Sequence, residues 1–201
     1  MEIKTDYLID TDLIKHAANS KYEKKKKLRQ FWEWIREEVK MDRGTIFTSD
    51  EIIHQIKVEE FKFIPKQDQE IKEILQELTS LAYFPSISTE HIVRMAASYL
   101  KNKYSFDFEL AGLKIEYPDV SQTRVILTAL EKDIGTIVTN KTDKFLVFLF
   151  LGGFDDIYLL NPLTDEQVTI PVTLYEKICN DDVFRSYQQE VQKYLYGNII
   201  E

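Results

Sequence analysis

The sequence has 201 residues, of which 44% are hydrophobic and 30% charged, as is ordinary for a folded globular protein. Its formal net charge of −8 argues against a broadly basic nucleic-acid-binding surface, so any contact with a polyanion has to be local. The single cysteine, Cys179, excludes an internal disulfide framework and fits a reducing compartment. No signal-peptide pattern precedes the first strand, and the longest apolar run, 145–153, is far shorter than the roughly 20 residues that a membrane helix needs. We therefore expect one cytoplasmic domain, residues 1–201, without a membrane segment.

Apolar spacing and capping residues predict the elements of the first third of the chain. We expect a strand at 7–10, helices at 11–19 and 22–40, a strand at 45–48 and a helix at 51–59. Thr11 or Asp12 is a candidate cap for the first helix, and Ser49 or Asp50 for the third. The helix at 22–40 has the clearest apolar stripe, which includes Trp32 and leaves Trp34 partly exposed.

Two prolines divide the middle of the chain, and short strands are expected near its end. We predict helices at 68–81, at 89–104 with Ser88 as cap, and at 119–133, with a less regular stretch at 105–118. Strands follow at 136–139, 145–151, 157–160 and 167–172, and one or two helices fill 174–196. Strands that alternate with helices predict an α/β fold with a mainly parallel central sheet covered on both faces, with room for an antiparallel edge.

Carboxylates follow two of the expected strands. Asp10 and Asp12 come directly after an apolar strand, and Asp143 comes after the strand at 136–139. Acids at strand ends suit Mg²⁺ or Mn²⁺, which prefer oxygen ligands. Lys141 stands where this layout would place another acid.

The order of elements resembles that of the PIN-domain family of metal-dependent ribonucleases. Residues 31–35 (FWEWI) and 45–53 (TIFTSDEII) are similar to a little-characterised bacterial PIN-like branch, and the resemblance covers most of residues 5–145. It implies a three-layer α/β domain, with a core at 1–64 and 119–145, a helical insert at 65–118, and C-terminal strands and helices at 146–201. It also implies an endoribonuclease of the toxin or defence type that uses Mg²⁺ or Mn²⁺, cleaves RNA and has an antitoxin-like protein partner.

Active members of this family bring four acids to the carboxyl ends of the parallel strands. The first matches Asp10, whereas the second, third and fourth fall on Gln55, Gln122 and Lys141. A glutamine cannot supply the charge that attracts a divalent ion, and a lysine repels it.

Two interpretations of these replacements stay open. In the first, Asp12, Glu51, Asp119 and Asp143 join Asp10 in a displaced catalytic site, with Asp10 and Asp143 as metal ligands; Glu51 and Asp119 lie about one helical turn from the lost positions. In the second, the Lys141 ammonium takes the place of the metal, and the chain is an inactive module without a cofactor that binds RNA or a protein partner. An unrelated nucleotide-binding domain is disfavoured, because no glycine-rich loop follows a strand. Asp12 is equally a candidate helix cap.

Basic and apolar segments are candidates for partner contacts. Lys24 and Lys25, which begin a lysine run, together with Arg94, Lys103 and Arg124, are candidates for nucleic-acid contact, although such charges more often form a solvated face. The apolar run at 145–151 is either covered by the C-terminal helices or forms the edge of a homodimer.

Overall fold

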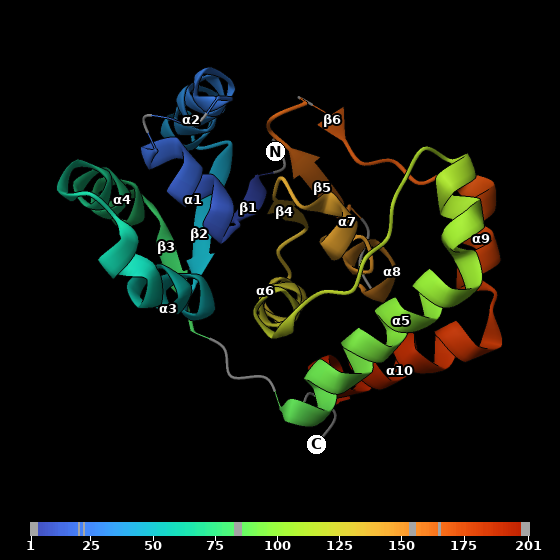
Figure 1. Ribbon diagram of the computed structural model, residues 1–201. Coiled ribbons are helices and arrows are strands. Elements are labelled where there is room, and N and C mark those ends of the chain that lie inside the picture. Colours follow the sequence, from blue (N-terminus) through green and yellow to red (C-terminus); the bar gives the residue numbers. More distant parts are fainter. Residues whose placement is uncertain are drawn as a thin grey trace.

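Parallel strands form the centre of the structure, a computed structural model that describes residues 4–197 except 20, 22, 83–85, 153–155 and 165. Within this part of the chain the sheet order is β3-β2-β1-β4-β5-β6 (Figure 1), and only β6 runs antiparallel to its neighbour. The strands are β1 (Thr5–Ile9), β2 (Gly44–Ser49), β3 (Thr79–Leu81), β4 (Thr136–Val138), β5 (Tyr158–Asn161) and β6 (Glu166–Gln167). The expected α/β class, with a mainly parallel sheet and an antiparallel edge, is confirmed.

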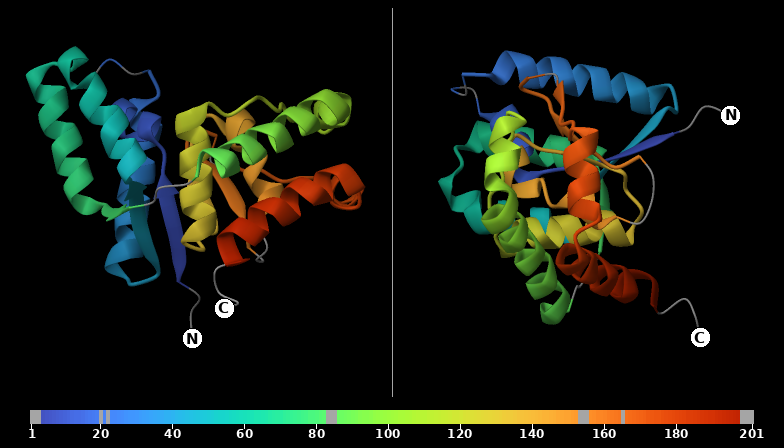
Figure 2. Two further views of the ribbon diagram at one scale, coloured as in Figure 1. Left: turned by 90° about the horizontal axis from the view of Figure 1, so that it is seen from below. Right: turned by 90° about the vertical axis from the view of Figure 1, so that its right-hand side faces the viewer.

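Helices cover both faces of this sheet. Before β4 in the chain come α1 (Thr11–Ala18), α2 (Lys25–Lys40), α3 (Asp50–Glu59), the short 3-10 helix η1 (Glu60–Lys62), α4 (Pro65–Glu77), α5 (Ile87–Leu110) and α6 (Val120–Glu131). After β4 come α7 (Thr142–Phe145), α8 (Phe148–Leu151), α9 (Val172–Cys179) and α10 (Asp182–Tyr196). The right-hand view of Figure 2 places α2 and α6 on opposite sides of the strands, and both figures show α5 beside α10. The result is the expected three-layer arrangement.

Burial on both faces explains the composition of the central strands. Tyr7, Leu8 and Ile9 of β1 are all buried, and so are all three residues of β4. A strand covered on both sides loses the alternation of polar and apolar residues. Fully burying one such aliphatic side chain stabilises a protein by about 1.5–3 kcal/mol. The buried strands β1 and β4 therefore hold the residues that follow them in fixed positions.

The run at 145–151 is helical, and the strand expected there is wrong. It forms parts of α7 and α8, and the side chains from Phe145 to Leu151 are all buried. A continuous apolar run has no period by which a buried strand can be told from a buried helix. This segment is therefore covered, and it does not supply the dimer edge considered from the sequence.

Three other expected elements differ in their bounds. The helix expected at 68–81 begins earlier, with Pro65 in its first turn, and Thr79–Leu81 instead forms the edge strand β3. Proline is tolerated there because the first N–H groups of a helix have no partner within it. Helix α5 is capped by Ser86 rather than Ser88 and continues to Leu110, through the first six residues of the stretch expected to be irregular. The strand expected at 167–172 is reduced to Glu166–Gln167.

The remaining helices follow the predictions closely. α2 begins at Lys25; position 22, where the helix was expected to begin, lies outside the described residues. The C-terminal segment forms the two helices α9 and α10. Among the described residues, no helix has the length and apolar character that crossing a membrane requires.

Candidate functional site

Asp10 lies at the carboxyl end of β1, next to the end of β4. It is 5% exposed; its Oδ1 accepts the Thr11 backbone N–H at 2.7 Å, and its Oδ2 accepts the Thr139 hydroxyl at 2.8 Å. The parallel register pairs Ile9 with Val138, so the residues after the two strands meet at one edge of the sheet. Asp10 is also the N-cap of α1, and the expectation that Thr11 or Asp12 caps this helix is wrong.

The Lys141 ammonium contacts Asp12. Its Nζ lies 2.5 Å from Asp12 Oδ2, while Lys15 Nζ lies 3.3 Å from Asp12 Oδ1 and 2.8 Å from a Glu59 oxygen. The Lys141 backbone N–H donates to the Thr139 hydroxyl at 3.0 Å, which holds the start of α7 against the end of β4. Two ammonium groups therefore share one carboxylate beside the buried Asp10.

The two aspartates differ in their ionisation. Burial raises the pKa of Asp10 to about 6, and the opposing effects of the Thr139 hydrogen bond and of Lys141 do not cancel it. Burial alone would also raise the pKa of Asp12, but Lys141 and Lys15 outweigh it and hold that pKa below its usual range. Lys141 in turn has a raised pKa, because Asp12 and, less strongly, Asp10 and Asp119 overcome the effect of burial. The pair formed by Asp12 and Lys141 is thus charged.

Glu51 belongs to a second network, which joins α3, α5 and α6. Its carboxylate accepts hydrogen bonds from the Ser121 hydroxyl at 2.7 Å, from Arg124 Nη1 at 3.0 Å and from the Gln55 amide at 3.4 Å. Arg124 Nε also donates to the buried Glu90 of α5 at 2.8 Å. Burial raises the pKa of Glu51, but the Ser121 and Arg124 bonds outweigh it and leave the pKa lowered. Both oxygens of Glu51 are therefore engaged within the protein.

The two glutamines at the positions where the resemblance implies acids have structural partners. Gln55 accepts the Thr11 hydroxyl at 2.8 Å, which connects the two networks. Gln122 forms a capping box with Asp119, in which each side chain accepts the other residue's backbone N–H, at 2.8 and 2.9 Å. The Asp119 carboxylate thus caps the N-terminus of α6.

Asp143 interacts with the segment at 114–116. It lies in the first turn of α7, where its carbonyl accepts the Glu116 N–H at 2.9 Å, and together with Glu116 it raises the pKa of Lys114. The pairing of Asp143 with Asp10 as metal ligands stays a prediction.

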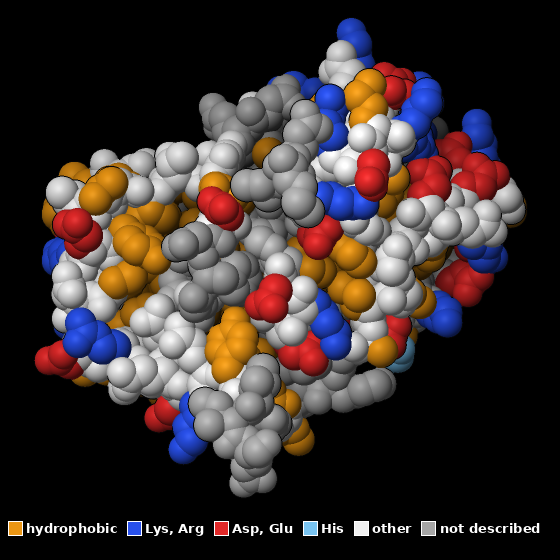
Figure 3. All heavy atoms as spheres, turned by 180° about the vertical axis from the view of Figure 1, so that it is seen from behind, with side chains coloured by type: hydrophobic (Ala, Val, Ile, Leu, Met, Phe, Trp, Pro, Cys, Tyr) orange, Lys and Arg blue, Asp and Glu red, His pale blue; other side chains and the backbone are white. Residues whose placement is uncertain are grey.

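The basic candidates for nucleic-acid contact are largely neutralised. Lys25 pairs with Glu70 at 3.4 Å, Lys103 with Asp181 at 2.5 Å, and Arg124 with Glu51 and Glu90. Of the five candidates, Lys24 and Arg94 are exposed and have no ion pair within the part of the chain that the structure describes. Figure 3 shows one face on which Lys and Arg are interspersed with Asp and Glu rather than gathered in a basic strip.

These residues do not fit a divalent metal. Within the described ranges, no three His, Cys, Asp or Glu side chains converge in a way that could hold an ion. Asp12 is bound by two lysines, Glu51 by an arginine, and Asp119 by its helix cap. Mg²⁺ and Mn²⁺ require several free oxygen ligands, and these carboxylates are engaged within the protein.

Three contributors to this site were missed from the sequence. Thr139 donates a hydrogen bond to Asp10, and Lys15 contacts Asp12 together with Lys141. Glu90 is the second carboxylate that Arg124 binds, and we call this arrangement of Glu51, Arg124 and Glu90 the Arg124 bridge. The position of Lys15, three residues after Asp12 on a helix, was a usable signal. Thr139 and Glu90 act across long sequence separations, and no local pattern marks such contacts.

Comparisons with known proteins give limited results. No family model matches the chain, and no curated protein matches it. Among solved structures, the chain is similar to the "Crystal structure of VapBC2 from Rickettsia felis bound to a DNA fragment from their promoter". The identity is 15%, the TM-score is 0.45, and the match covers 78% of this chain and 98% of that chain. A likeness at this level adds nothing to the fold, which rests on the strand order and registers.

Proposed function

We propose that this chain is a PIN-like domain in which internal ion pairs have taken the place of a divalent metal, and that it binds a partner without cleaving RNA. The observation that carries the proposal is the 2.5 Å contact between Lys141 Nζ and Asp12 Oδ2 beside the buried Asp10. The ammonium stands at the strand end where the family places its fourth acid.

The charges around Asp10 explain why a metal is excluded. A divalent ion next to Asp10 has to approach Lys141 and Lys15, both of which are held in place by Asp12. Repulsion between such charges is strong in a partly buried site, because the effective dielectric constant is far below that of water. Removing an ammonium from its carboxylate also leaves that acid without its counter-charge, which is costly in a buried setting.

Charge also favours a protein over RNA as the partner. Three of the five basic candidates, Lys25, Lys103 and Arg124, are bound to acids, and the chain has a formal net charge of −8. Binding to RNA depends on lysines and arginines that are free to displace counterions from phosphates. We therefore propose a protein partner, either an antitoxin-like protein or a second copy of this chain.

Calorimetry with Mn²⁺ tests the metal-free site. We expect no heat of binding for the wild type or for Asp10→Asn, and measurable binding for Lys141→Asp, which removes the ammonium and adds an acid. Heat of binding in the wild type that disappears in Asp10→Asn contradicts the proposal. Circular dichroism of each variant establishes that the fold is retained.

A metal-dependent endoribonuclease is the second candidate, and one observation favours it. Asp10 is buried at the carboxyl end of a parallel strand, where ligand sites fall in open α/β sheets, and burial raises its pKa to about 6. Mn²⁺-dependent cleavage of RNA that is lost equally in separately purified Asp10→Asn and Asp12→Asn supports this candidate. Cleavage that persists in both variants comes from a contaminant.

A further inference from the structure

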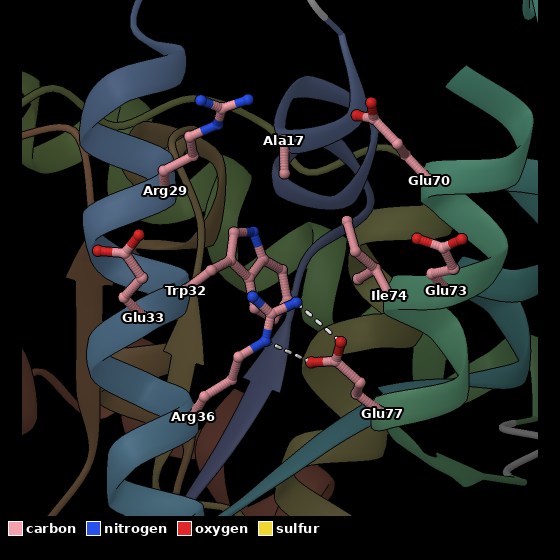
Figure 4. Close-up of a pocket in the computed structure, with 9 residues that line it drawn as sticks. All are labelled: Ala17, Arg29, Trp32, Glu33, Arg36, Glu70, Glu73, Ile74 and Glu77. Atoms are coloured by element: carbon pink, nitrogen blue, oxygen red, sulfur yellow. Dashed lines mark hydrogen bonds and ion pairs between the residues drawn. The ribbon is translucent and has the colours of Figure 1, made fainter. Parts of the chain in front are cut away.

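A groove between α2 and α4, away from the acid site, has features of a ligand site. Its volume is about 340 Å³, and Figure 4 shows its walls. The lining residues are Ala17 of α1, Arg29, Trp32, Glu33 and Arg36 of α2, and Glu70, Glu73, Ile74 and Glu77 of α4. We call this space the α2–α4 groove.

The indole N–H of Trp32 has no acceptor among the residues that the structure describes. The Trp32 side chain is 3% exposed, and its Nε1 is buried. In Figure 4 the ring extends from α2 into the groove, with its nitrogen on the side that faces Ala17. A buried donor without an acceptor costs about 1–3 kcal/mol, so a carbonyl or similar oxygen in the groove is favoured there.

The charges of the groove favour a cationic ligand. The lining contains four glutamates and two arginines, a sum of −2. Arg36 holds Glu77 through two hydrogen bonds, of 2.6 and 2.7 Å, and Lys25 lies 3.4 Å from Glu70. Glu33 and Glu73, on opposite walls, have no ion pair within the described part of the chain, although Glu73 accepts a hydrogen bond from the Gln69 amide at 2.9 Å and Glu33 helps to raise the pKa of Arg36. In Figure 4 their carboxylates lie on the two sides of the groove with Trp32 and Ile74 between them, so each favours a cationic group of its own.

We propose that the α2–α4 groove binds an extended polypeptide segment that carries arginine or lysine. A backbone carbonyl of the segment accepts the Trp32 N–H, and cationic side chains of the segment lie near Glu33 on one wall and near Glu73 on the other. Arg29, which has no ion pair among the described residues, donates to a second carbonyl at the end of the groove near Ala17. The inference deepens the proposed function, because it rests on a protein being the partner and specifies that partner's chemistry.

The carbonyl and the cation are both needed in this argument. A polyanion such as RNA offers oxygen acceptors but meets four glutamates. A simple polyamine satisfies the carboxylates but offers the Trp32 N–H no acceptor. A basic peptide supplies both groups at adjacent positions along one chain.

Proton–nitrogen correlation spectra test the groove directly. The chain has two tryptophans, and a Trp34→Phe variant assigns the two indole signals. The probe is an end-blocked peptide of sequence Arg-Ala-Leu-Arg-Ala. We expect the Trp32 Nε1–H signal to move downfield and saturate in the millimolar range, while the Trp34 signal stays in place. An unmoved Trp32 signal at saturating concentration overturns the proposal.

Variants and two other probes separate the alternatives. Glu33→Gln combined with Glu73→Gln should weaken binding of the peptide by roughly tenfold, whereas Glu37→Gln, an exposed glutamate outside the groove, should leave it unchanged. An equal response to the same peptide with glutamates in place of arginines contradicts the charge argument. An equal response to spermine shows that the groove takes small polycations rather than a peptide. The Mn²⁺ titrations do not depend on this groove, so either proposal can fail while the other stands.

Discussion

The Lys141 ammonium contacts Asp12 rather than Asp10, and this choice of partner determines how charge is balanced at the strand ends. Asp12 is stabilised as a carboxylate by Lys141 and Lys15, whereas Asp10 is more deeply buried and accepts hydrogen bonds from the Thr11 N–H and the Thr139 hydroxyl. One aspartate therefore has a lowered pKa and its neighbour a raised one. Lys141 thus acts on the pair of aspartates as a whole.

Lys141→Met should destabilise the protein. The variant leaves Asp12 with Lys15 as its remaining partner and removes the attraction that lowers the pKa of Asp10. Because the Lys141 side chain is 43% exposed, the expected loss is only about 1–2 kcal/mol. Urea denaturation at pH 7 measures it, with Lys144→Met on the same helix as control. Equal effects of the two variants, or an undiminished effect of Lys141→Met in an Asp12→Asn background, contradict a specific ion pair.

The raised pKa of Asp10 predicts that the protein loses stability as the pH rises. Between pH 4 and pH 6 the folded state retains the Asp10 proton while the unfolded chain has released it. The unfolded state binds fewer protons there, so the free energy of unfolding decreases with pH. With a folded pKa of about 6 against 3.8, the contribution of this group is on the order of 3 kcal/mol across that window.

Asp10→Asn tests this dependence. We expect the variant to be more stable than the wild type at pH 7, by less than the full contribution because the Thr139 hydroxyl loses a charged acceptor. The two stabilities should converge near pH 4. Urea denaturation at intervals from pH 4 to pH 8 gives both curves. A constant difference between them across this range means that Asp10 does not titrate as inferred.

The sequence predicted the fold well where periodicity was clear and poorly where it was absent. The amphipathic pattern of α2 and the apolar strand β1 gave the right elements. Thr79–Leu81 was assigned to the preceding helix, because three residues are too few to show a period of two. The buried run at 145–151 was assigned to the wrong class for a related reason, since an element that is apolar on all sides has no polar face to reveal its period.

The positions of the site residues were easier to predict than their partners. Parallel topology alone places the residues after β1 and β4 at one edge, which brings Asp10, Asp12 and Lys141 together. Whether the Lys141 ammonium contacts Asp10 or Asp12 depends on small differences in side-chain conformation, which the sequence does not give. The Arg124 bridge depends on where α5 passes α6, and no local pattern carries that information.

Arg124 should stabilise the contact of α5 with α3 and α6. Arg124→Met leaves the mostly buried carboxylates of Glu51 and Glu90 without their cation. We expect a loss of about 1–3 kcal/mol in the free energy of unfolding, and faster amide hydrogen exchange at the start of α5. In a double-mutant cycle, Arg124→Met and Glu90→Gln should show coupling of about 0.5 kcal/mol or more. Strictly additive effects contradict the bridge.

Asp181 should contribute more to stability than its neighbour Asp182. Asp181 is the N-cap of α10 and accepts hydrogen bonds from Tyr99, Tyr104 and Lys103 of α5, so it joins the two long helices. Its side chain is 5% exposed, whereas that of Asp182 is 97% exposed. We expect Asp181→Ala to cost about 2–4 kcal/mol and Asp182→Ala less than about 0.5 kcal/mol in urea denaturation at pH 7.

The pH dependence of this effect has the opposite sign to that of Asp10. Burial alone would raise the pKa of Asp181, but Lys103 and the two tyrosine hydroxyls outweigh it and hold the pKa well below the usual range. The stability that Asp181 provides is therefore fully present above about pH 4 and is lost as the pH falls toward the folded pKa. The difference between wild type and Asp181→Ala should accordingly shrink below pH 4. A difference that stays constant into that range assigns the effect to packing rather than to the charged hydrogen bonds.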